Sequence, residues 1–135
     1  MMKIDLNKAY DWVDWLFLRL VLHRIGLGTK VVAWIMGCVT KTSMEIIINE
    51  SATKFFQPGR GLRQGCALSP LLFILVMDDL SLGIRRDAAQ NSFQGIEISP
   101  QLNPTHSLFV DDISIFGMLV YNSWVVLKGF FFCFL

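Results

Sequence analysis

The stretch Leu108-Phe109-Val110-Asp111-Asp112-Ile113-Ser114-Ile115-Phe116 places two adjacent carboxylates between apolar residues. Apolar runs on both sides of a short polar pair are typical of a β-hairpin with the pair at its turn. Burying isolated carboxylates in such a setting is costly unless a positive charge meets them. No Lys or Arg lies between Ser107 and Gly117. We therefore expect a metal ion, or a basic side chain from elsewhere in the chain, to compensate these acids.

The sequence contains a second acidic pair, Asp78-Asp79, in a different context. It follows the apolar run from residue 71 to residue 77, and this arrangement fits the exposed edge of a helix. We interpret this pair as structural and expect it to lie away from any functional site.

A third acid and a glycine-containing loop complete the pattern. Asp5 ends the short strand-like run Lys3-Ile4-Asp5, and the segment GLRQGCALSP occupies residues 61–70. The order of KIDLNKAYDWVDW (residues 3–15), GLRQGCALSP and FVDD (residues 109–112) resembles the palm of a reverse transcriptase. The similarity is greatest to the type carried by non-LTR (LINE-like) retrotransposons, as found in plants, and covers about residues 2–117.

This resemblance implies RNA-templated DNA synthesis by a two-metal mechanism. Two magnesium ions about 3.5–4 Å apart can hold the attacking and the leaving oxygen of an in-line displacement. By analogy with the family, Asp5 and Asp111 hold the two Mg²⁺ ions, Asp112 shares in the coordination, and the Leu6 carbonyl is a backbone ligand. We therefore expect Asp5 and the acidic hairpin to converge in space.

The resemblance also assigns residues around the nucleotide. Tyr10 is expected to lie under the incoming sugar and to exclude a 2′-hydroxyl by its size; its alternative role is core packing. Gln64 and Gly65 match the loop that lies against the nucleotide and template, where glycine permits close backbone approach. Arg63 either contacts a phosphate or faces solvent.

Periodicity and turn signals predict an α+β fold, in which a palm-like antiparallel sheet, here truncated, carries helices on one face. A strand is expected at residues 4–6 and a buried helix from Asp11 or Asp14 to about residue 25. The other expected elements are a helix at 29–39, a hairpin of strands 44–49 and 53–57, a helix from Ser69 that stops near Gly83, a brief strand at 95–99, and the acidic hairpin.

The chain divides into a partial palm domain at residues 1–117 and an apolar tail at residues 118–135 that does not match the family. The tail reads MLVYNSWVVLKGFFFCFL. It is interpreted either as a frame-shifted or wrongly spliced end or as a marginal membrane segment. The first interpretation is favoured because Asn122, Ser123, Lys128 and Gly129 interrupt the apolar run.

Composition narrows the remaining possibilities. The 135 residues suffice for one domain with a core. The net charge of +1 counts slightly against a free-standing nucleic-acid binder, which usually has a basic face, although in the resembled family the fingers and thumb supply much of the basic contact. The spacing of Cys38, Cys66 and Cys133 disfavours a zinc site. The odd cysteine count indicates a reducing compartment, and the family suggests an intracellular location in nucleus or cytoplasm.

We therefore expect a palm fragment of an RNA-directed DNA polymerase that is inactive as an isolated chain. In the full-length family the partners are an RNA template, a DNA primer and dNTPs, gripped by fingers and thumb regions that this chain lacks. A viral-type RNA-dependent RNA polymerase is an alternative interpretation, because it also carries paired acids in a hairpin. Tyr10 and the segment RQGCALSP favour the reverse transcriptase. The alternative from another class is a small membrane-associated or interaction protein with incidental acids; a membrane partner is not expected.

Overall fold

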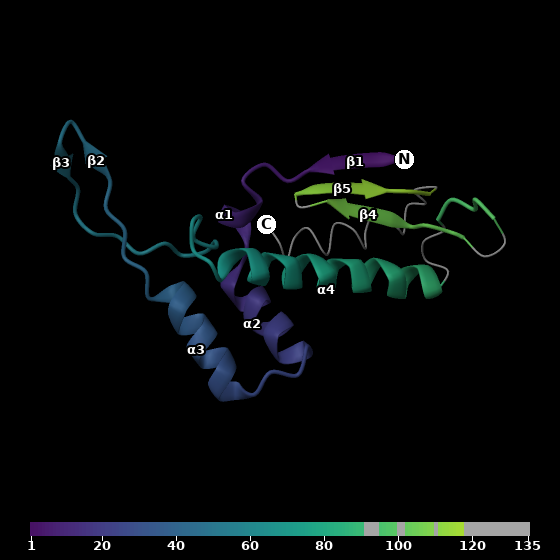
Figure 1. Ribbon diagram of the computed structural model, residues 1–135, viewed down its shortest axis with the longest axis horizontal. Coiled ribbons are helices and arrows are strands. Elements are labelled where there is room, and N and C mark those ends of the chain that lie inside the picture. The colour runs from purple at the N-terminus through teal and green to yellow at the C-terminus, as the bar shows by residue number, and fades with distance from the viewer. Residues whose placement is uncertain (91–94, 100–101, 110, 118–135) are drawn as a thin grey trace.

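A computed structural model describes residues 1–90, 95–99, 102–109 and 111–117 and shows an α+β fold with two small antiparallel sheets. Figure 1 shows the arrangement of the elements. In chain order these are β1 (Met2–Asp5), α1 (Ala9–Trp12), α2 (Trp15–Arg24), α3 (Thr29–Thr40), β2 (Ile47–Ile48), β3 (Ser51–Ala52), α4 (Ser69–Ala89), β4 (His106–Phe109) and β5 (Asp112–Ile115).

The larger sheet joins the first strand of the chain to the acidic hairpin, in the order β1-β5-β4 with both pairs antiparallel. Its three strands alternate apolar and polar residues, so one face becomes apolar and the other polar. Ile113 and Ile115 are fully or almost fully buried on the apolar face. The predicted acidic hairpin and its neighbouring N-terminal strand are confirmed.

Helix α4 lies along the sheet, and α2 and α3 lie beyond it (Figure 1). The core-facing stripe of α4 recurs at helical spacing and joins the sheet and α2 into one hydrophobic core. Its most buried members are Leu72, Phe73, Val76, Leu80 and Ile84. The predicted layer arrangement, with helices on one face of an antiparallel sheet, is therefore observed.

The predicted helix to about residue 25 is α2, and Asp14, one of its two predicted caps, is its N-cap. Asp14 has an extended backbone and accepts a hydrogen bond from the Phe17 N–H at 2.8 Å. The short helix α1, which begins before Asp11, was not predicted. The prediction that the helix is buried on several sides is wrong for Leu16 and Leu20, which are 66% and 51% exposed. Leu18 points instead into the core, because α2 packs only along one stripe.

The predicted hairpin after α3 is present, but its strands are shorter than expected. Asn49 and Glu50 both adopt left-handed backbone angles and form its two-residue turn. Strands β2 and β3 have two residues each, with one further bridge between Met44 and Phe56. The hairpin projects away from the three-stranded sheet (Figure 1), and no helix or further strand of the described residues packs extensively on it.

Helix α4 is longer than predicted, and the expected strand at residues 95–99 is absent from the described part of the chain. The helix continues through Gly83, which is buried, to Ala89, because packing outweighs the low helix propensity of glycine. Leu68, rather than Ser69, is the N-cap. Near Ser99 the structure has an isolated bridge to Leu102, and the Ile96 and Ile98 N–H groups donate to the carbonyls of Pro104 and Leu102 at 3.2 and 3.0 Å.

The predicted apolar tail at residues 118–135 lies outside the described residues, so the proposed domain boundary at residue 117 stays a prediction. Among the helices that the structure describes, none combines the length and the apolar character needed to cross a bilayer.

Candidate active site

The three acids singled out from the sequence meet at one end of the three-stranded sheet. Asp5 is the last residue of β1 and lies directly opposite Asp112, the first residue of β5. Directly opposed residues of antiparallel strands share a face and have Cβ atoms about 4.5–5.5 Å apart. The pair faces away from the core; Asp5 is exposed and Asp112 is half-buried. Two like charges in this position repel each other.

Asp111 occupies the turn next to this pair. Its carbonyl accepts a hydrogen bond from the Leu6 N–H at 3.1 Å, which extends the β1–β5 pairing by one step. The Leu6 carbonyl in turn accepts from the Ala9 N–H at 3.0 Å. Within the described residues, however, no three His, Cys, Asp or Glu side chains form a group that could hold a metal ion. The backbone thus converges as expected, while the three carboxylates are not gathered into a preformed metal site.

A basic side chain to which sequence reasoning gave no role also lies at this end of the sheet. Lys3 Nζ is 3.0 Å from Asp112 Oδ2. Lys3 is two positions before Asp5 and pairs with Ser114 across the sheet, so its side chain lies on the same face as both acids. The alternation of residues along β1 was the available signal, because it places Lys3 and Asp5 on one side of the strand.

The loop predicted to face the nucleotide is bound to the segment that follows Asp5. The Gly61 and Leu62 N–H groups donate to the carbonyls of Val13 and Tyr10 at 2.8 and 2.7 Å. The Trp15 indole N–H donates to the Gly61 carbonyl at 2.8 Å. The structure therefore joins the first and second sequence motifs through hydrogen bonds, although about fifty residues separate them.

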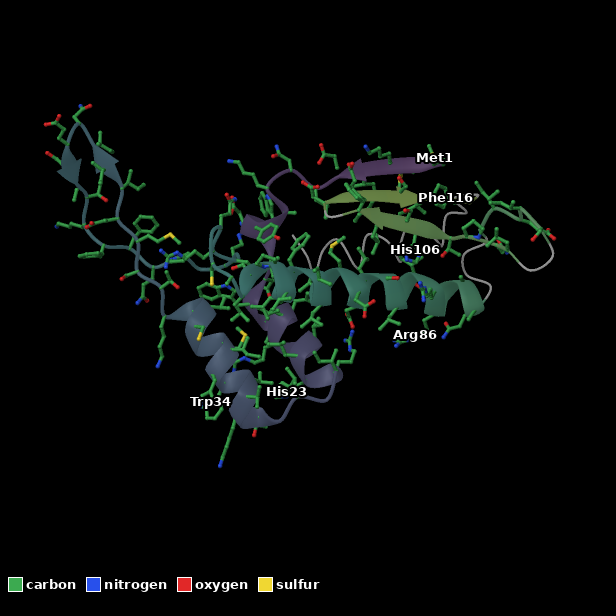
Figure 2. The ribbon with its side chains drawn as sticks, viewed as in Figure 1. Met1, His23, Trp34, Arg86, His106 and Phe116 are labelled. Atoms are coloured by element: carbon green, nitrogen blue, oxygen red, sulfur yellow. The ribbon has the colours of Figure 1, made fainter. Side chains whose placement is uncertain are left out.

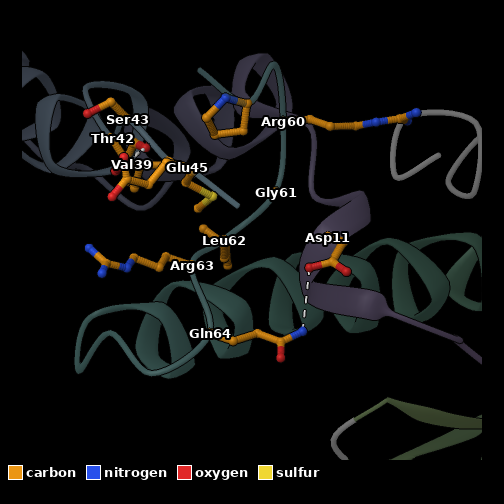
Figure 3. Close-up of a pocket in the computed structure, with 12 residues that line it drawn as sticks. Asp11, Val39, Thr42, Ser43, Glu45, Arg60, Gly61, Leu62, Arg63 and Gln64 are labelled. Atoms are coloured by element: carbon orange, nitrogen blue, oxygen red, sulfur yellow. Dashed lines mark hydrogen bonds between the residues drawn. The ribbon is translucent and has the colours of Figure 1, made fainter. Parts of the chain in front are cut away.

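Beyond this junction the loop lines a pocket of about 640 Å³ (Figure 3). The Gln64 side-chain amide lies 3.5 Å from Asp11 Oδ1, and Figure 3 shows this contact between the loop and α1. Arg63 and Gln64 are exposed, and Gly65 has a left-handed backbone with φ of 81°. Backbone N–H groups of Leu68 and Ser69 at the start of α4 lower the pKa of the Cys66 thiol, which follows Gly65.

The Tyr10 side chain is fixed by a ring contact. It stacks on Phe73 of α4 with ring centroids 4.6 Å apart and planes 13° from parallel. Together with Leu108 of β4, both rings line a second pocket of about 510 Å³. Tyr10 is half-buried against the core, so packing and exposure to a pocket coexist at this residue.

Comparison with known proteins supplies the family. The family model described as "Reverse transcriptase (RNA-dependent DNA polymerase)" matches residues 1–119, which include the acids, Tyr10 and the 61–70 loop. The chain belongs to the reverse transcriptase family.

Its relatives include proteins of non-LTR retrotransposons, as the sequence motifs indicated. The chain is 24% identical over 110 residues to a retrovirus-related Pol polyprotein from type-1 retrotransposable element R2 of Popillia japonica, which covers 82% of the chain and 17% of that protein. It is 27% identical over 113 residues to the transposon TX1 uncharacterized 149 kDa protein of Xenopus laevis. This match covers 83% of the chain and 8% of that protein.

A plant relative is closer in sequence over a shorter stretch. The chain is 46% identical over 71 residues to an uncharacterized mitochondrial protein of Arabidopsis thaliana, covering 50% of the chain and 57% of that protein. The matched part of the chain corresponds to between 8% and 57% of the length of these three relatives. It is thus a reverse transcriptase fragment relative to the retrotransposon proteins it matches.

The second acidic pair of this reverse transcriptase chain is not simply an exposed helix edge. Asp78 is exposed, but Asp79 is only 5% exposed, and both of its carboxylate oxygens lie 2.6 Å from Arg24 Nη1. The expectation was wrong for Asp79 because Arg24, 55 positions earlier, supplies the compensating charge. The structural interpretation fits Asp79, since this ion pair links α2 to α4. The expectation that the pair lies away from the candidate site is wrong for Asp78, which lines the same pocket as Tyr10 and Leu108.

Proposed function

We propose that this chain supplies the metal-holding acids and the nucleotide-facing loop of an RNA-directed DNA polymerase, arranged as in a palm. The observation that carries the proposal is the cross-strand pair of Asp5 and Asp112 beside Asp111. Two directly opposed carboxylates destabilise a sheet unless a cation lies between them. Such a pair on the polar face therefore favours a cation-binding role over a purely structural one.

The donor set fits magnesium. Carboxylate and carbonyl oxygens are the hard ligands that Mg²⁺ prefers, and Mg²⁺ keeps several of its waters. Asp5, Asp111 and Asp112 would hold two Mg²⁺ ions; the Leu6 carbonyl has a second lone pair beside its bond from Ala9. When bound, the ions stabilise charge on the attacking and leaving oxygens during nucleotidyl transfer.

The remaining residues act on the nucleotide by position. Stacking on Phe73 holds the Tyr10 ring in one orientation, and a fixed ring can exclude a 2′-hydroxyl sterically. The junction of Gly61 and Leu62 with residues 10–15 keeps Arg63, Gln64 and Gly65 at a fixed distance from this ring. Arg63 suits a phosphate contact because it is exposed and cationic.

Template, primer and dNTPs are the proposed partners, and their binding requires regions outside this fragment. The open face of the sheet provides one further contact surface, since Phe109 lies opposite Asp112 and is 76% exposed. An exposed aromatic ring beside the acids can stack on a base. Because catalysis of phosphoryl transfer depends on positioning, we propose that the isolated chain does not polymerise.

Metal binding tests this proposal directly. We expect the full chain to bind Mn²⁺, a hard-ligand substitute for Mg²⁺, as measured from the free Mn²⁺ signal in electron paramagnetic resonance. Asp5→Asn should weaken binding by tenfold or more, about 1.4 kcal/mol. The matched control is Glu50→Gln, which removes an exposed acid at the turn of the β2–β3 hairpin and should leave the affinity unchanged. Equal effects of the two substitutions would contradict the proposal.

Polymerase activity is tested in a chimera. Residues 1–117 would replace the matching region of the Popillia japonica Pol polyprotein, and primer extension on an RNA template would be measured. We expect Asp111→Asn to abolish extension and Tyr10→Ala to increase ribonucleotide incorporation while extension with dNTPs continues. Unchanged sugar discrimination in the Tyr10→Ala chimera would assign Tyr10 to the core alone.

A further inference from the structure

The contact of Lys3 with Asp112 differs from the ion pair of Arg24 with Asp79. Lys3 Nζ approaches one oxygen of Asp112 at 3.0 Å, and the two side chains are 60% and 37% exposed. In the structural pair, by contrast, both oxygens of Asp79 lie close to Arg24, and the Asp79 side chain is only 4% exposed. The Lys3 contact is therefore open to solvent and uses one carboxylate oxygen.

The position of Lys3 explains how the sheet tolerates two opposed acids without a metal ion. The Asp5–Asp112 pair carries two negative charges on one face, and the ammonium group of Lys3 lies on that face. A lysine side chain carries a point charge on a flexible four-carbon stem, so it can neutralise an acid and also swing away. Exposed ion pairs of this kind contribute little free energy, so displacing this one costs little.

The same contact opposes metal binding. Lys3 Nζ occupies one lone pair of Asp112 Oδ2 and offsets its charge, and the described acids are not gathered into a metal site. A divalent cation must therefore displace Lys3 or bind at reduced strength. A doubly charged ion competes effectively because hard oxygen ligands favour it.

We propose that Lys3 is a built-in counter-ion of the acidic site, which pairs with Asp112 in the metal-free chain and is displaced when a divalent cation binds. This inference rests on the proposed metal-holding role of Asp5, Asp111 and Asp112. Lys3 is then a positioning residue, because it acts through Asp112. It stabilises the metal-free sheet and lowers the affinity for the metal, two effects of opposite sign.

The test measures both effects in the full chain. Lys3→Met keeps the length and apolar stem of the side chain but removes its charge. We expect Lys3→Met to lower the Kd for Mn²⁺ two- to fivefold and to lower the thermal unfolding midpoint in EDTA. Lys3→Arg retains the charge and should restore both values toward those of the unsubstituted chain.

Lys8→Met is the matched control because it removes the same charge from an exposed lysine beside α1. Its Kd for Mn²⁺ should stay within twofold of the unsubstituted chain. If Lys3→Met reduces solubility, Lys3→Gln replaces it in the same assay with the same expectation.

The outcomes separate the two proposals. A Kd that rises or does not change in Lys3→Met, or that falls equally in Lys8→Met, overturns the counter-ion role while leaving the metal site intact. If Asp5→Asn binds Mn²⁺ as tightly as the unsubstituted chain, the metal site itself is wrong and the counter-ion role falls with it. A lower Kd with a lower midpoint in EDTA, specific to Lys3, supports the proposal, because a merely structural lysine would weaken both properties.

Discussion

At Gly61 the absence of a side chain keeps the nucleotide-facing loop against α1. Its φ is 91°, and a Cβ built there would lie 2.9 Å from the Asp11 carbonyl oxygen. We expect Gly61→Ala to destabilise the chain by about 1–3 kcal/mol through left-handed strain and this contact. The measurement is the midpoint of urea unfolding.

Gly59→Ala is the control for Gly61→Ala, since apart from the two neighbouring residues no described heavy atom lies within 4 Å of a Cβ built at Gly59. We expect Gly59→Ala to unfold close to the unsubstituted midpoint. Equal midpoints for the two variants would show that the loop is not held as the structure indicates.

Asp79 and Asp78 are neighbours with different environments, so their substitution separates a buried ion pair from a solvated acid. Asp79→Asn removes the charge that meets Arg24 at 2.6 Å and should cost about 1–3 kcal/mol of unfolding free energy. Asp78→Asn should change it by less than about 0.5 kcal/mol. Chemical denaturation of both variants measures the difference, and a loss as large for Asp78→Asn as for Asp79→Asn would contradict this assignment.

The sequence predicted single residues well where local chemistry decides their role. Alternation of polar and apolar residues placed Asp5 and the acidic hairpin, and Asp14 was among the two predicted helix caps. Arg24 could not be found as the partner of Asp79, because only the tertiary packing of α2 on α4 brings them together. The Lys3–Asp112 pair similarly depends on strand register, which links residues more than a hundred positions apart.

Helix α4 and strand β4 are joined by a partly buried hydrogen-bond chain at His106. Figure 2 shows His106 between the sheet and α4. Its Nε2 lies 2.7 Å from Ser81 Oγ, and its Nδ1 lies 2.8 Å from Thr105 Oγ1. Burial, aided by the positive charge of Arg85, lowers the pKa of the His106 imidazole below its usual 6.5. The environment of His106 at this junction therefore favours the neutral imidazole over the protonated one.

This junction predicts an acid-sensitive fold. The native pKa of His106 lies below the unfolded value, so the unfolded chain binds more protons between the two values. Stability is full above about pH 6.5 and falls as the pH drops, at no more than about 1.4 kcal/mol per pH unit for this residue. We expect the unfolding free energy to fall less between pH 7.5 and 5.5 in His106→Gln than in the unsubstituted chain. His23→Gln, at an exposed position, should retain the full decrease.

Element boundaries were less predictable than element types. The stop expected at Gly83 did not occur, because Gly83 lies in the buried stripe of α4, where packing overrides propensity. The expected strand at residues 95–99 contains alternating isoleucines, yet Ile96 and Ile98 are exposed. Their N–H groups donate to the Pro104 and Leu102 carbonyls, but in the described part of the chain this pairing amounts to one isolated bridge, Ser99–Leu102. A periodic pattern is better supported as a strand where its apolar side chains also pack against a core.

At the scale of the whole molecule, the β2–β3 hairpin leaves apolar side chains uncovered. Ile46, Ile47, Ile48 and Phe55 are each more than half exposed. Ile47 and Ile48 form β2, the other two lie beside the hairpin strands, and in the described part of the chain no third strand joins β2 and β3. Exposed apolar strand edges promote association between chains. We therefore expect the full chain to aggregate when expressed alone.

Ile47→Lys tests this expectation, since a charge on an edge strand opposes edge-to-edge pairing. Light scattering at matched concentrations should show less aggregate for Ile47→Lys than for the unsubstituted chain. Leu82→Lys introduces the same charge on the exposed side of α4 and serves as the control. If both lysines reduce aggregation equally, net charge rather than the hairpin governs solubility.

The hydrogen bond from the Trp15 indole to Gly61 has a consequence for how this chain can vary. It joins the two residues that flank the segment 16–60, which contains α2, α3 and the β2–β3 hairpin. The ends of this segment are therefore held together at its base and not through the hairpin. Doubling the length of a flexible loop costs only about 0.6 kcal/mol. We therefore expect insertions at the Asn49-Glu50 turn to lengthen only the hairpin and to leave the position of Gln64 relative to Asp5 unchanged. The length of the hairpin and the chemistry of the site can thus change independently.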